Sequence, residues 1–258
     1  MFLYQRDNST HHHHIHTMIY DDFKFEQHLH SDLELVFPLA GAVNICLRDR
    51  EEEIKCGEMA LVLPNELHSF YTPESSQVLV CVFSPDYVQS FAGMIEGKRG
   101  EKSVFPCSKG VKAIINETFF ELSEPGDMHF KAVFYAVCAH YLSYVGRFQE
   151  YSQVDGVLEK VIRYVEENYR ENITLSDAAR AIGYSESYIS RCFHQTAGIN
   201  FRRFLNYYRI QYVCRNMSDK KGISELALAA GFQNLRSFNR AFQESMGMAP
   251  RDYFGKSF

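Results

Sequence analysis

The sequence has no tryptophan, no long apolar run and no signal-peptide pattern. A membrane-spanning helix needs about 18 or more consecutive apolar residues, and no stretch approaches that length. The first residues, MFLYQRDNST, lack the basic start, apolar core and small-residue cleavage site of a secretory signal. We therefore expect a cytoplasmic protein that does not act at a membrane.

The sequence also lacks closely spaced cysteines. Its seven cysteines are scattered, and no two of them form a CxxC pair. An odd, irregularly spaced set is not typical of a disulfide framework, and the absence of CxxC argues against a zinc knuckle. We expect reduced thiols that pack mostly as small hydrophobic side chains.

The charge is divided unevenly along the chain. The 258 residues, enough for two domains, carry a formal net charge of -5. Residues 152–258 contain 15 Lys+Arg and 11 Asp+Glu, a net of +4, which leaves 12 and 21, a net of -9, for residues 1–151. This asymmetry predicts different partners for the two halves.

Two kinds of pattern divide the acidic half. Residues 1–105 contain short β-rich runs separated by turn residues, which is typical of a barrel or a sandwich. In residues 106–150 the apolar residues recur at helical spacing on both sides of EPGD, which predicts a helical hairpin. Its apolar faces either form a dimer interface or pack on the barrel.

The basic half contains an internal repeat. LSDAARAIGYSESYISRCFHQTAG, from Leu175, aligns with ISELALAAGFQNLRSFNRAFQESMG, from Ile223. Gly183 matches Gly231 at an offset of 48, and Phe193 matches Phe242 at an offset of 49. This similarity indicates the duplication of one supersecondary unit.

Each copy has the parts of a helix-turn-helix. The first helix contains small alanines that allow close helix crossing, and it ends at a glycine, where a positive φ is least costly. Expected N-cap pairs of the first helices are Thr174 with Asp177 and Ser224 with Glu225, and Ser185 and Asn234 are expected to cap the second helices. A helical bundle without a DNA function is the alternative, which two matching copies disfavour.

The basic half resembles the DNA-binding domain of the AraC/XylS family of bacterial transcription regulators. The resemblance rests on these residues: Ala179, Gly183, Ser185, Phe193, Gly198, Arg209, Gly231, Phe232, Ser237, Phe238, Arg240, Phe242, Gly247, Pro250 and Tyr253. The departures are Val213, Asn216 and Met217, where the family usually has Ala and a Leu pair, and Phe254, where Arg is usual. They affect packing and a backbone contact, and leave the class unchanged.

The resemblance implies that one chain presents two recognition helices to successive major grooves of DNA. The candidate DNA-binding residues on the outer faces of the second helices are Ser187, Ser190, Arg191, Arg236, Asn239 and Arg240. Arginine can bind guanine and asparagine can bind adenine through paired hydrogen bonds, whereas serine discriminates little. A phosphate contact or a local ion pair is the alternative for each arginine. Lys220, Lys221 and Arg251 are expected to contact phosphates.

The stretch QHLHSDLELVFPLAG is similar to the first motif of the cupin barrel, through His28, His30, Glu34 and Gly41. A looser second motif contains Gly57, Pro64 and His68, with Glu66 near the usual glycine position. In cupin enzymes the matching histidines and glutamate hold one metal ion, and such a set suits Zn, Fe, Mn or Ni.

Regulators of the AraC type often carry such a cupin as a sensor of a small molecule. We therefore interpret His28, His30, Glu34 and His68 as ligand-binding residues, because His and Glu also recognise hydroxyl groups. We assign no metal, no cofactor and no catalytic residue, and a divalent metal bound by the same residues stays the alternative. The tract HHHHIH at residues 11–16 is interpreted as part of a first strand without a dedicated metal.

Together these patterns predict an α+β multidomain protein. It consists of a cupin-like barrel (1–105), a helical hairpin with a dimerisation role (106–150) and an all-α double helix-turn-helix domain (151–258). We expect a transcription regulator that is not an enzyme. Its expected partners are promoter DNA, a small molecule such as a sugar, a second copy of the chain and, for an activator, RNA polymerase. A metal-dependent enzyme with a DNA-binding tail and a ligand-independent dimeric regulator are the alternatives.

Overall fold

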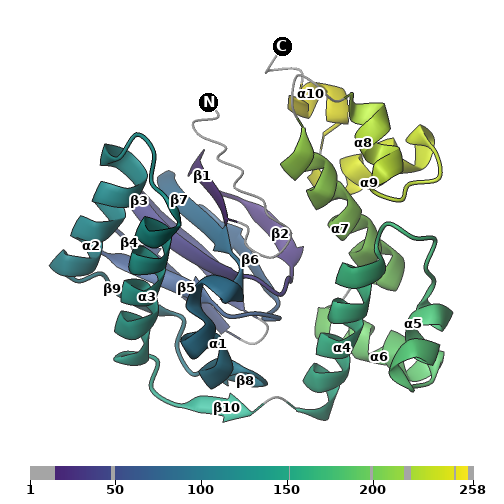
Figure 1. Ribbon diagram of the computed structural model, residues 1–258, viewed down its shortest axis with the longest axis horizontal. Coiled ribbons are helices and arrows are strands. Elements are labelled where there is room, and N and C mark those ends of the chain that lie inside the picture. The colour runs from purple at the N-terminus through teal and green to yellow at the C-terminus, as the bar shows by residue number, and fades with distance from the viewer. Residues whose placement is uncertain are drawn as a thin grey trace. The chain divides into compact units, whose positions relative to one another are not determined.

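The computed structural model describes residues 15–47, 50–150, 152–197, 200–217, 222–246 and 248–254. Its contacts divide the chain into two compact units, Met1–Ser152 and Gln153–Phe258 (Figure 1). Within the described part of the chain, every helix is too short or too polar to cross a membrane. The structure thus has the predicted class, a β-rich unit with added helices followed by an all-α unit.

The first unit is built around one antiparallel sheet. Its eight strands are β1 (Ile15–Asp21), β2 (Phe25–His28), β3 (Leu33–Leu47), β4 (Arg50–Lys55), β5 (Glu58–Val62), β6 (His68–Tyr71), β7 (Ser76–Phe83) and β9 (Val104–Pro106). A separate pair consists of β8 (Lys98–Gly100) and β10 (Phe148–Glu150). Two short helices follow β7, a 3-10 turn at Pro85–Val88 and α1 (Gln89–Ile95).

The long strand β3 connects the two halves of this sheet. Its first part lies between β5 and β7, and its second part lies between β4 and β6. The sequence pattern predicts two strands with a break at Gly41, whereas in the structure the strand continues through Gly41 with a φ of 69°. Pro38, which the sequence predicts to lie at an edge or a bulge of this strand, is beside an irregularity, because the pairing with β7 shifts register between Pro38 and Ala40.

Alternating residues of β3 face two hydrophobic cores, since successive side chains of a strand point to opposite sides. Leu35 and Phe37 belong to the core that the helical hairpin covers, and Val36 belongs to the other core. Glu34 shares the parity of Val36, so its carboxylate is placed on the side away from the hairpin. A polar group is thereby brought into an otherwise apolar interior.

The helical hairpin covers one face of the sheet (Figure 1). It consists of α2 (Lys109–Asn116), a π-helical turn (Glu117–Glu121) and α3 (Asp127–Leu142). The rings of Phe83 in β7 and Phe134 in α3 stack with their centroids 3.8 Å apart. The apolar stripe of α3 therefore packs on the sheet, as in the second of the two predicted alternatives.

The second unit contains two groups of three helices. Its helices are α4 (Gln153–Asn168), α5 (Leu175–Ile182), α6 (Glu186–Ala197), α7 (Phe201–Asn216), α8 (Ile223–Ala229), α9 (Leu235–Met246) and α10 (Pro250–Phe254). Helices α4, α5 and α6 pack together, and α7 packs with α8 and α9. The first helix of the second group, α7, also joins the two groups. The pairs α5–α6 and α8–α9 are the two predicted helix-turn-helix units.

The structure confirms most of the N-caps and turn glycines that the sequence predicts for these helices. Thr174 and Asp177 form a capping box at α5, and both turn glycines have a positive φ, 76° at Gly183 and 94° at Gly231. The prediction that Ser224 caps α8 is wrong, because this helix begins at Ile223 and its N-cap is Gly222, two residues before Ser224.

The C-terminal end of α4 is where the two groups meet. From α7, Arg209 donates hydrogen bonds from Nε to the carbonyl oxygen of Tyr169 and from Nη2 to that of Glu171, each 2.8 Å long. A Cβ placed on Gly231 would lie 2.5 Å from the carbonyl oxygen of Arg170. The segment that directly follows α4 thus contacts both the joining helix α7 and the second turn.

Candidate functional site

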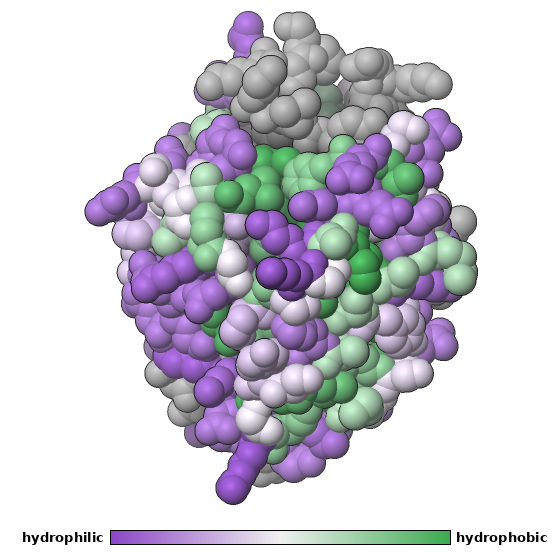
Figure 2. Space-filling model, turned by 90° about the vertical axis from the view of Figure 1, so that its left-hand side faces the viewer, coloured by the Kyte–Doolittle hydropathy of each residue, from purple (hydrophilic) through white to green (hydrophobic). Residues whose placement is uncertain are grey.

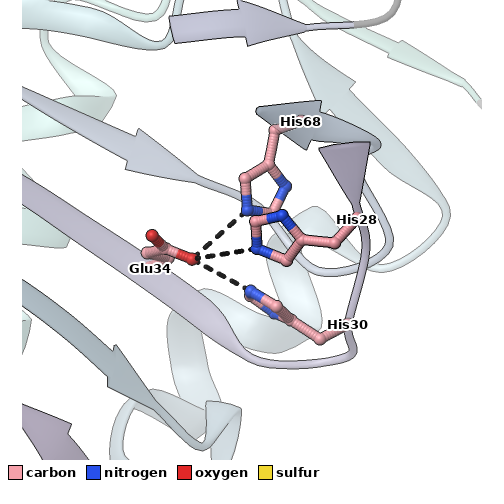
Figure 3. Close-up of side chains that lie close together, drawn as sticks. All are labelled: His28, His30, Glu34 and His68. Carbon is pink, nitrogen blue, oxygen red and sulfur yellow. Dashed lines mark hydrogen bonds and ion pairs between the residues drawn. The ribbon is translucent and has the colours of Figure 1, made fainter. Parts of the chain in front are cut away.

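Four polar side chains from three parts of the first sheet converge on one point (Figure 3). His28 ends β2, and its cross-strand partner is His68, the first residue of β6. His30 follows in the loop after β2, and Glu34 lies near the start of β3. The predicted ligand-binding residues are therefore brought together by the fold, although they come from positions up to 40 residues apart.

The three imidazoles point their Nε2 atoms at a single carboxylate oxygen. Glu34 Oε2 lies 3.0 Å from Nε2 of His30, 3.2 Å from Nε2 of His68 and 4.0 Å from Nε2 of His28. The four potential ligand atoms all lie within 4.8 Å of one another. Such convergence can bind a cation or a small polar molecule.

This polar cluster is buried. The exposed fractions are 6% for His28, 8% for His30, 3% for Glu34 and 0% for His68. The ring of Phe70 lies 5.4 Å from that of His68, so an apolar wall borders the cluster. Charge carried inside such a wall is expensive unless it is closely paired.

Two opposite effects act on the pKa of the Glu34 carboxyl group. Burial alone would raise the pKa of its carboxyl group, but hydrogen bonds from His30 and His68, together with their charge, outweigh burial. The pKa of Glu34 therefore lies well below its ordinary value, and the residue is a carboxylate at neutral pH.

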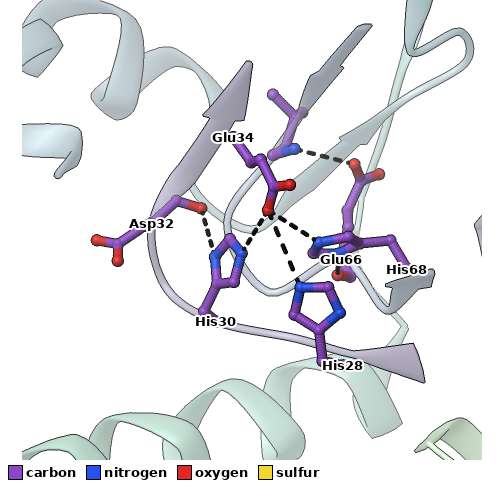
Figure 4. Close-up of polar contacts among 7 residues, drawn as sticks. His28, His30, Asp32, Glu34, Glu66 and His68 are labelled. Carbon is purple, nitrogen blue, oxygen red and sulfur yellow. Dashed lines mark hydrogen bonds and ion pairs between the residues drawn. The ribbon is translucent and has the colours of Figure 1, made fainter. Parts of the chain in front are cut away.

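Main-chain carbonyl groups hold two of the rings from the other side (Figure 4). Nδ1 of His30 lies 3.1 Å from the carbonyl oxygen of Asp32, and Nδ1 of His68 lies 2.7 Å from that of Glu66. The carboxylate of Glu66 points elsewhere and accepts a hydrogen bond from the amide of Leu63. Burial raises the pKa of Glu66 to about 7.

Sequence reasoning missed these main-chain contacts. A carbonyl oxygen belongs to every residue, so no side-chain pattern can indicate which of them reaches a histidine ring. Of the tract at residues 11–16, His11 to His14 lie outside the described residues. Ile15 begins β1, and Nε2 of His16 lies 3.0 Å from Sδ of Met18 in the same strand.

In the first helix-turn-helix unit, the predicted DNA-binding residues lie exposed on α6. Ser185 precedes the helix and accepts a hydrogen bond from the amide of Tyr188. Ser187, Ser190 and Arg191 are all exposed, whereas the neighbouring Ile189 is buried. The helix thus presents a small polar surface that ends in one positive charge.

In the second unit, the predicted residues lie exposed on α9. Asn234 caps this helix by accepting a hydrogen bond from the amide of Ser237, 2.8 Å long. Arg236, Asn239 and Arg240 are exposed. Nε of Arg240 lies 3.9 Å from Glu244, so the ion pair considered as an alternative is present in the free protein. The outer face of α9 therefore carries more charge and hydrogen-bonding capacity than that of α6.

The remaining predictions for the DNA-binding half concern one residue of the apolar seam and several expected phosphate contacts. The helical spacing of Leu235, Phe238, Ala241 and Phe242 predicts one apolar seam on α9, but Leu235 is the first residue of the helix and is 40% exposed. Arg251, expected near a phosphate, is exposed at the start of α10. Lys220, Lys221, Gly198 and Gly247 lie outside the described residues.

A buried polar site on a β-rich unit and two exposed recognition helices define a two-part class of DNA-binding regulator. The sequence model of the AraC-like ligand binding domain matches residues 14–178, and that of a helix-turn-helix domain matches residues 178–256. The first match alone extends over more than half of the chain. The chain belongs to the AraC family of transcription regulators.

Curated relatives agree with this assignment over the DNA-binding half. An uncharacterized HTH-type transcriptional regulator of Staphylococcus aureus strain MSSA476 is 31% identical over 120 residues, which are 45% of this chain and 16% of the relative. The regulator YisR of Bacillus subtilis is 30% identical over 109 residues, 41% of this chain and 37% of the relative. The aligned parts thus span well under half of each of these relatives.

Solved structures resemble the whole fold. A structure of ToxT from Vibrio cholerae at 1.65 Å resolution covers 93% of this chain and 98% of its own, with a TM-score of 0.67 and 20% sequence identity. A second ToxT structure, from strain O395, has a TM-score of 0.65 over 93% of this chain and 97% of its own, also at 20% identity. At such low identity, the likeness is one of fold.

Proposed function

We propose that this chain binds promoter DNA through α6 and α9 and regulates transcription in response to a small molecule bound by the first unit. One observation carries the proposal: the two helix-turn-helix units both present exposed polar residues on the helix that enters the major groove in this motif. The membership of the AraC family supports it, as do the relatives that are transcriptional regulators.

The effector is proposed to bind at His28, His30, Glu34 and His68. These groups offer hydrogen-bond donors and acceptors inside an apolar wall, which suits a ligand with hydroxyl or carboxylate groups. A sugar is one candidate. One ToxT structure contains an unsaturated fatty acid, so a carboxylate with an alkyl chain is a second candidate.

The remaining partners follow from the same proposal. We propose that the chain forms a homodimer through the helical hairpin, because Phe120, Met128 and Tyr135 expose 45%, 75% and 40% of their surface there. Figure 2 shows hydrophobic side chains among hydrophilic ones on this side of the first unit. An activator would in addition contact RNA polymerase. A cytoplasmic, non-enzymatic role fits the family of regulators.

Selection from a random DNA library by the full chain tests the DNA-binding part. The expected result is a preferred motif, lost in a variant with Arg236→Ala and Asn239→Ala but kept with Gln243→Ala, an exposed change on the same helix. Binding that shows no sequence preference at any salt concentration contradicts the proposal.

Thermal denaturation with sugars and unsaturated fatty acids tests the effector part. A ligand that binds only the folded chain raises its midpoint, and the increase should disappear in His30→Ala. An increase that survives this change places the ligand elsewhere.

A further inference from the structure

The first residues of the two recognition helices occupy the same place in the duplicated sequence but differ in chemistry. Glu186 begins α6 and Leu235 begins α9, and they align at the offset of 49 that also aligns Phe193 with Phe242. Both side chains are exposed, that of Leu235 to 40%. Because the first copy carries an exposed and charged glutamate here, the motif does not need an apolar residue at this position in order to fold.

Leu235 lies at the border between the core side and the outer side of α9. Residues four apart on an α-helix lie nearly in line along one face. Leu235 thus precedes Asn239 by one turn, and Asn239 is exposed and predicted to contact DNA. On the other side of Leu235, Phe238 and Phe242 are buried. The leucine is therefore an apolar neighbour of the polar residues that the outer face of α9 presents.

Hydrogen bonds at the start of α9 fix the backbone of this leucine. Oδ1 of Asn234 accepts a hydrogen bond from the amide of Ser237, 2.8 Å long, and the hydroxyl of Ser237 donates to the carbonyl oxygen of Asn234 over 2.7 Å. Leu235 lies between these two residues in the chain. A partner that covers its side chain therefore does not have to order this turn first.

An apolar side chain beside base-reading residues has one matching group in the major groove. The N-terminal residues of a recognition helix contact base edges there. Of the four bases, thymine alone presents a methyl group in this groove, and apolar side chains contact it. The side chain of Leu235 has no hydrogen-bonding atom, so the thymine methyl is the group that it can recognise.

Helix geometry also limits which thymine this is. Cβ atoms four residues apart on a helix are about 5–6 Å apart. Successive base pairs of DNA are about 3.4 Å apart. The thymine that Leu235 covers is thus expected about one or two base pairs from the base that Asn239 contacts.

We infer that Leu235 is a specificity-determining residue, whose apolar side chain contacts the 5-methyl group of a thymine in the target DNA. The inference rests on the proposed function, because it requires α9 to enter the major groove. Exposure alone does not carry it, since single exposed leucines are common on protein surfaces. Leu228 is 56% exposed, but it lies on the first helix of the motif, which crosses the DNA backbone. Leu228 therefore provides a matched apolar control.

Replacement of thymine by deoxyuridine tests this inference, because it removes only the methyl group. The DNA is the motif that the full chain selects from a random library, and each thymine is replaced separately. Fluorescence anisotropy then measures the binding of the full chain under the conditions of the selection. One replacement should weaken the binding of the wild-type chain about fourfold, as expected for one methyl group that loses its apolar contact. The replaced base should lie about one or two base pairs from the position at which Asn239→Ala relaxes the preference.

Variants show whether the leucine makes this contact. In Leu235→Ala, the thymine and deoxyuridine motifs should bind equally well. Leu235→Glu introduces the residue type that the first copy tolerates at this position, and it should also remove the difference. Leu228→Ala should keep both the affinity and the fourfold difference. Circular dichroism verifies that each variant is folded, and either change at Leu235 is sufficient for the test.

Three results overturn the inference. The first is equal binding of the wild-type chain to every deoxyuridine motif, and the second is a selected motif without a thymine near the base that Asn239 contacts. The third is a fourfold difference that persists in the folded variants of Leu235, because another residue then contacts the methyl group. Binding without any sequence preference rejects the proposed function. A preferred motif that shows no methyl effect rejects the role of Leu235 alone.

Discussion

The two helix-turn-helix units come from one duplicated sequence, yet they are fixed in the second unit in different ways. A Cβ added at Gly183 in the first turn would meet nothing within 4 Å. A Cβ added at Gly231 in the second turn would collide with the main chain at the end of α4. Both glycines have a positive φ, so the same residue type serves local conformation in one copy and a long-range contact in the other.

The recognition helices differ in parallel with the turns. The recognition helix of the first unit, α6, exposes two serines and an arginine. That of the second unit, α9, exposes two arginines and an asparagine. Serine reads base edges with little discrimination, whereas arginine and asparagine form paired hydrogen bonds to single bases. We therefore expect the second copy to supply more of the specificity, and its turn is the one that packs against the main chain that follows α4.

Replacement of the two glycines tests the difference in the turns most strongly. Gly231→Ala combines a left-handed backbone, which costs about 1–2 kcal/mol for other residues, with overlap on the carbonyl of Arg170. We expect it to lower the free energy of unfolding by about 3 kcal/mol or more, and Gly183→Ala by about 1 kcal/mol. Urea unfolding followed by circular dichroism measures both. Equal losses would remove the distinction between the two turns.

Removal of Arg209 tests the contact from the joining helix. Arg209→Met keeps the length of the side chain but leaves the carbonyl groups of Tyr169 and Glu171 without their donor. The expected loss in unfolding free energy is about 2–3 kcal/mol. Arg202→Met changes an exposed arginine of the same helix and is expected to cost little. Similar losses in the two variants would show that the carbonyl contacts contribute nothing special.

Substitutions on the recognition helices test the difference in specificity. Arg236→Ala and Asn239→Ala should each weaken binding to the selected DNA motif by about 1–3 kcal/mol and relax the preference at one base position. Ser187→Ala and Ser190→Ala should have smaller effects. Electrophoretic mobility shifts on the motif and on single-base variants measure both. A larger loss from the serines would reverse the comparison.

The N-caps of α5 and α8 are expected to give the smallest difference in stability between the two helix-turn-helix units. Thr174→Ala removes the side chain that caps α5 and should cost about 1 kcal/mol of stability. Ser224→Ala should cost almost nothing, since α8 begins after Gly222 without a side-chain cap. The same urea unfolding series compares the two. A clear loss of unfolding free energy in Ser224→Ala would show that Ser224 caps α8 after all.

The cap of the first copy also predicts a pH dependence. The hydroxyl and amide of Thr174 lower the pKa of Asp177, so the capping interaction is fully present above the ordinary pKa of an aspartate. It is lost as the pH falls through the lower pKa of the folded state. The difference between wild type and Thr174→Ala should therefore shrink in acid, and a difference that grows there would contradict the cap.

Periodicity and motif spacing were sufficient to predict the class of fold and the convergence of His28, His30, Glu34 and His68. Local signals in the sequence failed to predict three details of the structure. At α8 the helix begins at Ile223, one residue before the expected serine cap, and at α9 the first residue, Leu235, lies too early to be covered. Near Gly41, pairing with two neighbours keeps β3 continuous despite a strong turn residue.

The orientation of the histidine rings could not be predicted from the sequence. It depends on the carbonyl oxygens of Asp32 and Glu66, which are identical in kind to every other carbonyl in the chain. Only the folded path of the loops after β2 and β5 places them behind the rings. Residue identity therefore predicted the members of the site, and tertiary structure determined which of their atoms face one another.

The contact between Gly231 and the end of α4 limits how this protein can be recombined with its relatives. A chimaera that exchanged the second helix-turn-helix alone would set a foreign turn against Tyr169 and Arg170, whose guanidinium also lies 4.7 Å from the ring of Tyr212 in α7. The exchangeable segment consequently includes the end of α4 and the joining helix. The first copy, whose turn touches nothing at that glycine, is the easier one to graft.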